Sequence, residues 1–478
     1  MIWVTTATLQ LSKCQRHFGN NDHEIMNYQL TLPAPVSMLL SRLKESGFSA
    51  YVVGGCVRDA LLGIAPHDWD ICTSALPEQM QEVFHDLHTV ETGLKHGTLT
   101  VVVNHEPYEV TTFRVDGDYT DHRHPDSVCF VDNLTEDLAR RDFTVNAMAW
   151  SPDTGLADPF SGQQDLADNL IRCVGEAEKR FDEDALRILR ALRFASVYDF
   201  AIEPATSAAL RKMAPDLSRV AGERIREELL KLLCGKAAGR ILREYPEVLA
   251  EIIPEIGPMI GYDQQNHHHS YDLWEHTVRG IEGVPAEPIL RLTMLLHDTG
   301  KPAARTTDEK GEGHYKGHQK YSEKIARKTA EALRLDNASR ERLCNLVLHH
   351  DIPLRSESGA INTDRSFLLR RLNRFGEEDL RTLFLIHRSD RIATGYTTRE
   401  REDARLKERM AALDALLAEQ PCFTLKDLAV NGRDLIAAGL KGKAVGEALQ
   451  ALLDAVMDGK VPNEKAALLA ALPTLYQF

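Results

Sequence analysis

The sequence Gly54-Gly55-Cys56-Val57-Arg58-Asp59, followed after a short gap by Asp68-Trp69-Asp70, decides the fold of the first part of this chain. The apolar run Phe48–Val53 predicts a strand, and Cys56–Leu62 predicts a short helix, so the glycine pair lies at the turn between them. Glycine lets the backbone bend sharply and lets a bulky ligand approach closely. Free N–H groups at the start of a helix suit a triphosphate.

The two aspartates lie in a predicted short strand, Asp68–Cys72. Positions i and i+2 of a strand face the same side, so both carboxylates point to one place, where they can hold Mg²⁺. Taken alone, a glycine pair is usually a simple turn, and an Asp-x-Asp is usually solvated surface. Together they resemble the nucleotidyltransferase signature of the polymerase-beta superfamily, and they predict nucleotidyl transfer.

Composition limits the class of protein. A chain of 478 residues is too long for one core and predicts about three or four domains. No apolar run approaches the length of a membrane span, so we expect no membrane partner. Eight scattered cysteines without a C-x-x-C pair predict reduced thiols and a cytoplasmic location. The net charge of −14 disfavours nucleic acid, but Lys179–Arg243 holds 14 Lys/Arg against 9 Asp/Glu. That surplus fits either a confined nucleic-acid track or a solvated helical face.

The periodicity predicts an α+β head followed by an all-α body. Thr98–Val103 and Tyr108–Phe113 read as a strand pair joined by Asn104–Pro107, and Asp116–Asp132 reads as a polar loop. Helical spacing dominates from about Asp165 onward. Four clear helices are Leu186–Phe194, Arg224–Leu233, Ile289–Leu296 and Tyr321–Leu333, and a charged helix, Thr398–Glu419, follows. The expected domains are an extension (1–30), a head with a mixed or antiparallel sheet (31–160), a helical neck (161–260), a metal-binding helical domain (261–395) and a helical tail (396–478). Within the extension, Met1–Ile25 is expected to be poorly ordered, and Met26 is a plausible start.

A third carboxylate, Glu109, lies on the strand after the aspartates, on the side of Thr111 and Phe113. In two-metal phosphoryl transfer, one ion activates the attacking 3′-hydroxyl and the other steadies the leaving pyrophosphate. A third acidic ligand suits that chemistry, so Asp68, Asp70 and Glu109 are the predicted catalytic residues. The alternative for Glu109 is an ordinary surface residue.

Two further motifs predict nucleotide contacts. Arg140-Arg141-Asp142-Phe143-Thr144-Val145-Asn146-Ala147 offers phosphate clamps and ribose acceptors. Glu183-Asp184-Ala185-Leu186-Arg187 reads as helix, with Asp184 and Arg187 at i and i+3 on one face. An Asp can accept from the amino group of cytosine or adenine while an Arg donates to the ring nitrogen, and uracil and guanine present a carbonyl instead. The alternative is a salt bridge within the helix.

These residues carry a resemblance to class II tRNA nucleotidyltransferases, the bacterial CCA-adding enzymes, over about residues 50–235. The matched segments are Gly54–Asp59, Asp68–Asp70, Arg140–Ala147, Asp158–Phe160, Ile171–Gly175, Glu183–Arg187 and Glu223–Ile225. The resemblance implies catalytic Mg²⁺ at Asp68 and Asp70, an amino-acid template for CTP and ATP at Asp184 and Arg187, and tRNA as partner. The nucleotide-binding set that we predict is Gly54, Gly55, Arg58, Arg140, Asp142, Asn146, Asp184, Arg187 and Arg190. The sister family, bacterial poly(A) polymerase, shares most motifs. The Asp116–Asp132 loop corresponds to the segment needed for the switch to ATP.

A second metal constellation follows in the helical body. Imidazole and carboxylate ligands from neighbouring helices suit Mn²⁺, Fe²⁺ or Ni²⁺ better than Mg²⁺ alone. The set resembles the HD phosphohydrolase domain, whose core ligands correspond to His276, His297, Asp298 and Asp390, with His318 and His349 at accessory positions. The consecutive His267, His268 and His269 do not face one direction and read as polar loop. The alternative for this domain is a spacer without activity.

The tail segments Phe423–Leu428 and Val430–Leu435 resemble the tRNA-binding region of the same family, which contacts the tRNA elbow by shape and phosphate. The sequence therefore predicts addition of C, C and A to tRNA from CTP and ATP, with an additional HD phosphohydrolase activity. The alternatives are a poly(A) polymerase or A-adding enzyme and, in another class, an HD phosphohydrolase with an RNA-binding head. The oligomeric state stays open.

Overall fold

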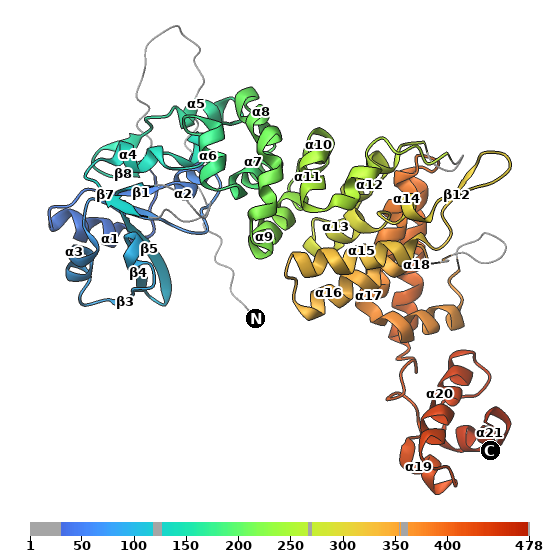
Figure 1. Ribbon diagram of the computed structural model, residues 1–478. Coiled ribbons are helices and arrows are strands. Elements are labelled where there is room, and N and C mark those ends of the chain that lie inside the picture. Colours follow the sequence, from blue (N-terminus) through green and yellow to red (C-terminus); the bar gives the residue numbers. More distant parts are fainter. Residues whose placement is uncertain (1–29, 118–126, 266–269, 353, 355–361, 477–478) are drawn as a thin grey trace. The chain divides into compact units, whose positions relative to one another are not determined.

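The computed structural model describes residues 30–117, 127–265, 270–352, 354 and 362–476 (Figure 1). Residues 1–29 of the predicted extension and His267–His269 lie outside these ranges, as does 118–126 of the predicted loop. The chain divides into two compact units, and each is described by itself. One runs to Thr112 and includes Met148–Asp158; the other holds Phe113–Ala147 and everything from Pro159 onward. Residues 113–147, expected in the head, thus belong to the second unit, and the finer domain boundaries remain predictions.

A seven-stranded sheet forms the first unit, in the order β3-β4-β5-β2-β1-β8-β9. Only β2 and β5 pair in parallel, so the predicted mixed sheet is confirmed. The strands are β1 Ala50–Val53, β2 Ile71–Thr73, β3 His88–Val90, β4 Thr98–Val103, β5 Glu106–Thr112, β8 Ala149–Ser151 and β9 Gly155–Ala157. The helices are α1 Ala34–Glu45, α2 Gly55–Leu61, α3 Pro77–Val83 and the 3₁₀ turn η1 Leu94–His96.

Local sequence explains these elements. In α1, Val36, Leu39, Leu40 and Leu43 are buried at helical spacing. The β4–β5 turn contains two residues, Asn104 and His105, with φ of 53° and 69°. Positive φ at both central positions is typical of a tight hairpin turn, so the expected four-residue connection was too long.

The second unit is almost entirely helical, as predicted (Figure 1). Its helices are α4 Leu134–Ala139, α5 Gly162–Ala167, α6 Ala177–Glu183, α7 Leu186–Tyr198, α8 Pro204–Met213, α9 Gly222–Leu233, α10 Ala238–Glu244, α11 Pro246–Ile252, α12 Leu273–Gly283, α13 Pro288–Leu296, α14 Lys301–Ala304, α15 His318–Ala332, α16 Asn337–His349, α17 Arg365–Ala393, α18 Arg399–Ala418, α19 Gly432–Ala437, α20 Lys443–Met457 and α21 Lys465–Leu475. Its strands are β6 Arg114–Asp116, β7 Val128–Phe130, β10 Leu170–Ile171, β11 Ala201–Ile202, β12 Thr306–Thr307 and β13 Gly313–His314, and its 3₁₀ turns are η2 Thr144–Asn146, η3 Ala214–Arg219 and η4 Pro254–Met259.

Strands β6 and β7 pair with each other at the two ends of the segment expected to be loop. The predicted loop is therefore shorter than Asp116–Asp132, because both of its ends are in a two-stranded ladder. None of the helices in the described part of the chain is long and apolar enough to cross a bilayer.

Candidate active site and metal centre

The glycine turn of the first unit needs glycine at its first position. Gly54 has φ 81° and ψ −126°, a conformation that side chains rarely allow, and its amide donates to the carbonyl of Met148 at 3.0 Å. Gly55 begins α2, and Nη2 of the buried Arg58 would lie 3.6 Å from a Cβ at Gly55. Arg58 also pairs with Asp59 at 2.8 Å. The turn therefore offers close backbone approach beside a guanidinium.

The two aspartates precede β2, which begins at Ile71, so the predicted strand Asp68–Cys72 started too early. The carbonyl of Asp70 nevertheless accepts from the amide of Val53 at 3.0 Å, which extends the ladder by one residue. Asp68 and Asp70 are exposed and Trp69 is half-buried. This alternation places both carboxylates on the solvent-facing side.

Glu109 shares that exposed side of the sheet. Ile71 of β2 pairs with Val110 of β5 in parallel register, and both side chains are buried. Asp70 and Glu109 each come one residue earlier, so their side chains face the opposite side. Glu109 is exposed, and Phe113 lies beyond the end of β5. Asp70 and Glu109 therefore share an exposed face, and a Mg²⁺ ion held by Asp68, Asp70 and Glu109 stays a prediction.

Asp142 of the second unit anchors a buried polar cluster. One carboxylate oxygen accepts from Nε and Nη2 of Arg190, at 2.9 and 2.6 Å, and the other accepts from the amide of Phe143 and from Nδ2 of Asn146. Burial alone raises the pKa of Asp142, but Arg190, Asn146 and Arg187 outweigh it and hold that pKa well below its usual range. Asp142, Asn146 and Arg190 thus contact one another, and their predicted contacts with nucleotide stay a prediction.

Replacing Asp142 by Ala is expected to lower the free energy of unfolding by about 2 kcal/mol, because Arg190 loses its shorter ion pair and keeps the longer one, to Glu228 at 3.7 Å. The folded-state pKa is lowered, so this contribution is present above the unfolded pKa of about 3.9 and is lost as pH falls through the folded value. Urea unfolding at pH 7 and at pH 3 measures it. The control is Lys212→Ala, whose pair with Glu178 is mostly exposed and contributes less than about 1 kcal/mol. Equal effects of the two substitutions would contradict the role of Asp142.

The Glu183–Arg187 segment is not one continuous helix, which corrects the prediction. Helix α6 ends at Glu183, Asp184 has an extended backbone (φ −149°, ψ 103°), and α7 begins at Leu186. Asp184 accepts from the amide of Leu186, the first residue of α7, at 3.1 Å. The i,i+3 face expected for Asp184 and Arg187 therefore does not exist.

These two residues have different partners. Asp184 forms a two-point ion pair with Arg224 of α9, at 2.7 and 3.2 Å. Arg187 pairs with Glu183 at 2.7 Å and donates to the carbonyl of Arg140 at 3.2 Å. The alternative, a salt bridge between Asp184 and Arg187 within one helix, is not formed by these two described residues. Arg224 and Glu183 belong to the matched motifs, but the sequence alone indicated no role for either residue.

A cavity of about 560 Å³ lies beside Arg140 in the same unit. Arg140 pairs with Asp137 at 3.0 Å and with Asp116 of β6 at 3.6 Å. Lys179, Arg180 and Glu183 also line the cavity. Asp116, Glu136 and Asp182 line it too, so the charge around this cavity is mixed and does not by itself indicate a phosphate site.

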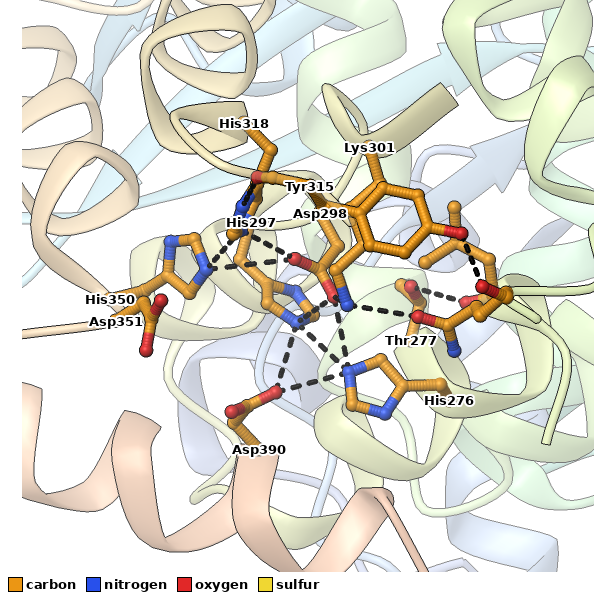
Figure 2. A network of polar contacts seen from close by, with 12 residues as sticks. His276, Thr277, His297, Asp298, Lys301, Tyr315, His318, His350, Asp351 and Asp390 are labelled. Atoms are coloured by element: carbon orange, nitrogen blue, oxygen red, sulfur yellow. Dashed lines mark hydrogen bonds and ion pairs between the residues drawn. The ribbon is translucent and has the colours of Figure 1, made fainter. Parts of the chain in front are cut away.

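The predicted HD ligands meet in the helical body (Figure 2). His276 comes from α12, His297 and Asp298 follow α13, and Asp390 lies in α17. His276 Nε2 is 3.2 Å from Asp298 and 3.0 Å from Asp390, and His297 Nε2 is 3.2 Å from Asp298. The ligand atoms of the four residues all lie within 4.8 Å of one another.

A second group shares Asp298. Its other oxygen, Oδ1, lies 3.1 Å from Nε2 of His318 and 3.6 Å from Nε2 of His350. His349 was predicted here and is wrong: its ring packs on Phe375, and its Nε2 contacts Arg374 at 3.1 Å. The buried stripe Leu343, Leu346 and Val347 of α16 continues at position 350, not 349. That periodicity is the signal that sequence reasoning missed.

Backbone carbonyls orient three of the rings. Nδ1 of His297, His318 and His350 lies 2.7 to 2.9 Å from the carbonyls of Met294, Tyr315 and Val347. A carbonyl only accepts, so each Nδ1 carries hydrogen and Nε2 is the ring nitrogen that faces the Asp298 carboxylate.

Charge in this site is tightly coupled. Burial lowers the pKa of His297, but Asp298 and Asp390 outweigh it and raise that pKa to about 10. Burial raises the pKa of Asp298, whereas His297 and Lys301 lower it far below its usual range. Buried Lys301 lies 2.7 Å from Asp298 Oδ2 and donates to Gln264 at 3.0 Å. The carboxylates are therefore ionised and ready to bind cations.

A cavity of about 540 Å³ opens beside these ligands. It is lined by both candidate ligand carboxylates, Asp298 and Asp390, and by basic side chains, among them Lys301, Lys316 and Arg391. Metal ligands facing cations across an open space suit an anionic phosphoester.

Four family models match the chain. They are described as the poly A polymerase head domain (50–172), the "Probable RNA and SrmB- binding site of polymerase A" (199–257), the HD domain (266–415) and the tRNA nucleotidyltransferase domain 2 (371–472).

Whole-length relatives are similar as well. A CCA-adding enzyme of Levilactobacillus brevis is 36% identical, with 91% of this chain and 96% of the relative covered. One of Geobacillus stearothermophilus is 37% identical, with 91% and 95% covered. The crystal structure of a Bacillus stearothermophilus CCA-adding enzyme in complex with CTP aligns with a TM-score of 0.66 at 32% identity, over 93% of this chain and 98% of that one.

Proposed function

The chain belongs to the CCA-adding enzymes, and from that premise we propose that it adds C, C and A to tRNA 3′ ends by two-metal nucleotidyl transfer at Asp68, Asp70 and Glu109. The observation that carries the proposal is the exposed carboxylate face beside the Gly54 turn. Mg²⁺ held there supplies an activated 3′-hydroxyl and charge neutralisation for the leaving pyrophosphate. Arg58 and the free amides at the start of α2 bind triphosphate oxygens.

The test is to incubate tRNA lacking its 3′ end with each nucleoside triphosphate alone and to read product lengths. CTP alone should give two additions, whereas ATP alone should add one residue only to tRNA already ending in C-C. A poly(A) polymerase would build long tails with ATP alone. An HD phosphohydrolase with an RNA-binding head would add nothing.

Asp184 and Arg187 select the base in this proposal, with Asp184 accepting from the exocyclic amino group and Arg187 donating to the ring nitrogen. Ion pairs position these two side chains, in place of the shared helix face that was expected. Arg224 of α9 pairs with the Asp184 carboxylate, and Glu183 pairs with Arg187. A fixed pair of this kind accepts C and A, and it opposes the carbonyl of U or G.

Asp184→Ala and Arg187→Ala are each expected to relax base choice, raising UTP incorporation relative to CTP about tenfold or more, because one lost base contact is worth about 1–3 kcal/mol. Triphosphate affinity should change less, since the phosphates contact other residues. Single-turnover incorporation of CTP, ATP, UTP and GTP measures the ratio, with circular dichroism as the check on folding. Unchanged selectivity in a folded variant would refute the template role.

We also propose a metal-dependent phosphohydrolase at the HD site, which the two ligand groups sharing Asp298 favour. One ion would be held by His276, His297, Asp298 and Asp390, and a second by Asp298, His318 and His350. Mixed imidazole and carboxylate donors fit Mn²⁺, Fe²⁺ or Ni²⁺. Such ions supply activated water at neutral pH. Lys301 fixes Asp298 by its ion pair, and Lys316 and Arg391 offer charge to a phosphate.

A further inference from the structure

The first part of α17 has an unusual charge for this chain. Residues 365–375 hold four arginines and no carboxylate, although the whole protein carries −14. Two of these arginines are neutralised from the tail: Arg365 pairs with Glu419, and Arg370 pairs with Asp458 at 2.6 Å. The other two arginines of the segment have a different environment.

Arg371 and Arg374 lie one helical turn apart on the same face of α17. Within the residues that the structure describes, no carboxylate oxygen lies within 4.0 Å of either guanidinium. Nε of Arg371 is buried and donates to no described atom. Burial and the charge of Arg374 lower the pKa of the Arg371 guanidinium. Two like charges therefore lie close together without a counter-charge.

The acidic residues that follow along the chain are already paired. Glu377 pairs with Arg381 at 2.9 Å, and Glu378 and Asp379 both pair with Arg342 at 2.9 Å. An anionic ligand therefore has no ion pair to displace when it approaches the two arginines.

Aromatic rings hold the two guanidinium groups in place. The guanidinium of Arg371 lies 4.9 Å from the ring centre of Phe367, and that of Arg374 lies 5.3 Å from the ring centre of Phe375. His349 packs on Phe375 at 5.1 Å, and its Nε2 accepts from Nη2 of Arg374 at 3.1 Å. A guanidinium that lies against a ring keeps its N–H edge for a ligand. The Arg374 side chain is exposed, so a ligand can reach it from solvent.

We propose that Arg371 and Arg374 together bind one backbone phosphate of the tRNA substrate. Arginine forks match the oxygens of a phosphate group, and two uncompensated charges attract a polyanion. This rests on the proposed nucleotidyltransferase function and adds a contact to its RNA partner. The two arginines do not line the HD cavity, so the contact concerns the position of tRNA and not hydrolysis.

The test measures the affinity of the full-length protein for tRNA lacking its 3′ end, by filter binding at several salt concentrations. Arg371→Ala with Arg374→Ala should raise Kd about tenfold, and the lost phosphate contact should reduce the slope of log Kd against log salt by about 0.9. KM for CTP and kcat at saturating tRNA should stay unchanged. The control with the same charge change is Arg327→Ala with Arg340→Ala, because both of these guanidiniums pair with Glu341.

The conservative variant separates charge from geometry. Arg371→Lys with Arg374→Lys should restore the salt slope but only part of the affinity, because lysine keeps the charge and lacks the planar fork. If the alanine double variant unfolds, Arg374→Ala alone decides the question, since its exposed side chain leaves no cavity. That single variant should raise Kd about threefold.

An unchanged Kd and salt slope in the folded variants, or an equal loss in the control pair, would overturn the proposal. Failure of the proposed function gives a different result. If the wild type binds tRNA but adds no nucleotide, the nucleotidyltransferase function fails, and Kd and its salt slope still decide the phosphate contact. A wild type that does not bind tRNA would contradict both.

Discussion

Asp68→Ala and Asp70→Ala are each expected to reduce nucleotide addition about a thousandfold or more while folding and tRNA binding persist. Both carboxylates are exposed, so their removal leaves no cavity and no buried unpaired charge. The loss is one of transition-state stabilisation, because a metal ligand contributes several kcal/mol and each 1.36 kcal/mol is tenfold in rate.

Single-turnover addition of CTP to tRNA lacking its 3′ end measures this effect, with filter binding for tRNA affinity. Glu109→Gln should reduce nucleotide addition to a similar extent, since Glu109 faces the same side of the sheet. Glu106→Gln is the matched control: it lies on β5 and is exposed, but it stands at the hairpin end, opposite Val103. Near wild-type addition by either aspartate variant would refute this site.

The second large effect concerns the HD centre. His297→Ala combined with Asp298→Ala should abolish hydrolysis of 2′,3′-cyclic nucleotides with Mn²⁺ or Ni²⁺, because Asp298 belongs to both ligand groups. Addition of C, C and A should stay nearly unchanged, since these ligands lie outside every nucleotidyltransferase motif. Phosphate release and tRNA extension, measured on the same preparation, give the comparison.

Two single variants test the same assignment if the double variant unfolds. His350→Ala should lower hydrolysis at least a hundredfold and reduce bound metal, whereas neighbouring His349→Ala should do neither, because its ring packs on Phe375. Metal content after dialysis gives a readout besides activity. Absence of hydrolysis by the wild type with every divalent metal, or hydrolysis that survives the double substitution, would overturn the assignment.

Periodicity predicted the parts of this fold that local sequence determines. Helices α7, α9, α13 and α15 lie where apolar spacing placed them, and the mixed sheet follows from short alternating strands. The four HD core ligands also meet as predicted, because each is next to or within a clearly periodic helix.

The errors arose where contacts distant in sequence decide the backbone. Glu183-Asp184-Ala185 has the composition of a helix, yet Asp184 is extended and paired with Arg224, forty positions away. No local signal shows that pair. The error at His349 was different, since the buried stripe of Leu343, Leu346 and Val347 in the sequence already pointed to position 350.

The central claim is tested most directly by sequencing the 3′ ends formed when tRNA lacking its terminal nucleotides is incubated with CTP and ATP together, without any nucleic-acid template. The account predicts a single product ending in C-C-A, with addition stopping after A. Tails of adenosine of varied length, C-C ends that never receive A, or unextended tRNA would each contradict it.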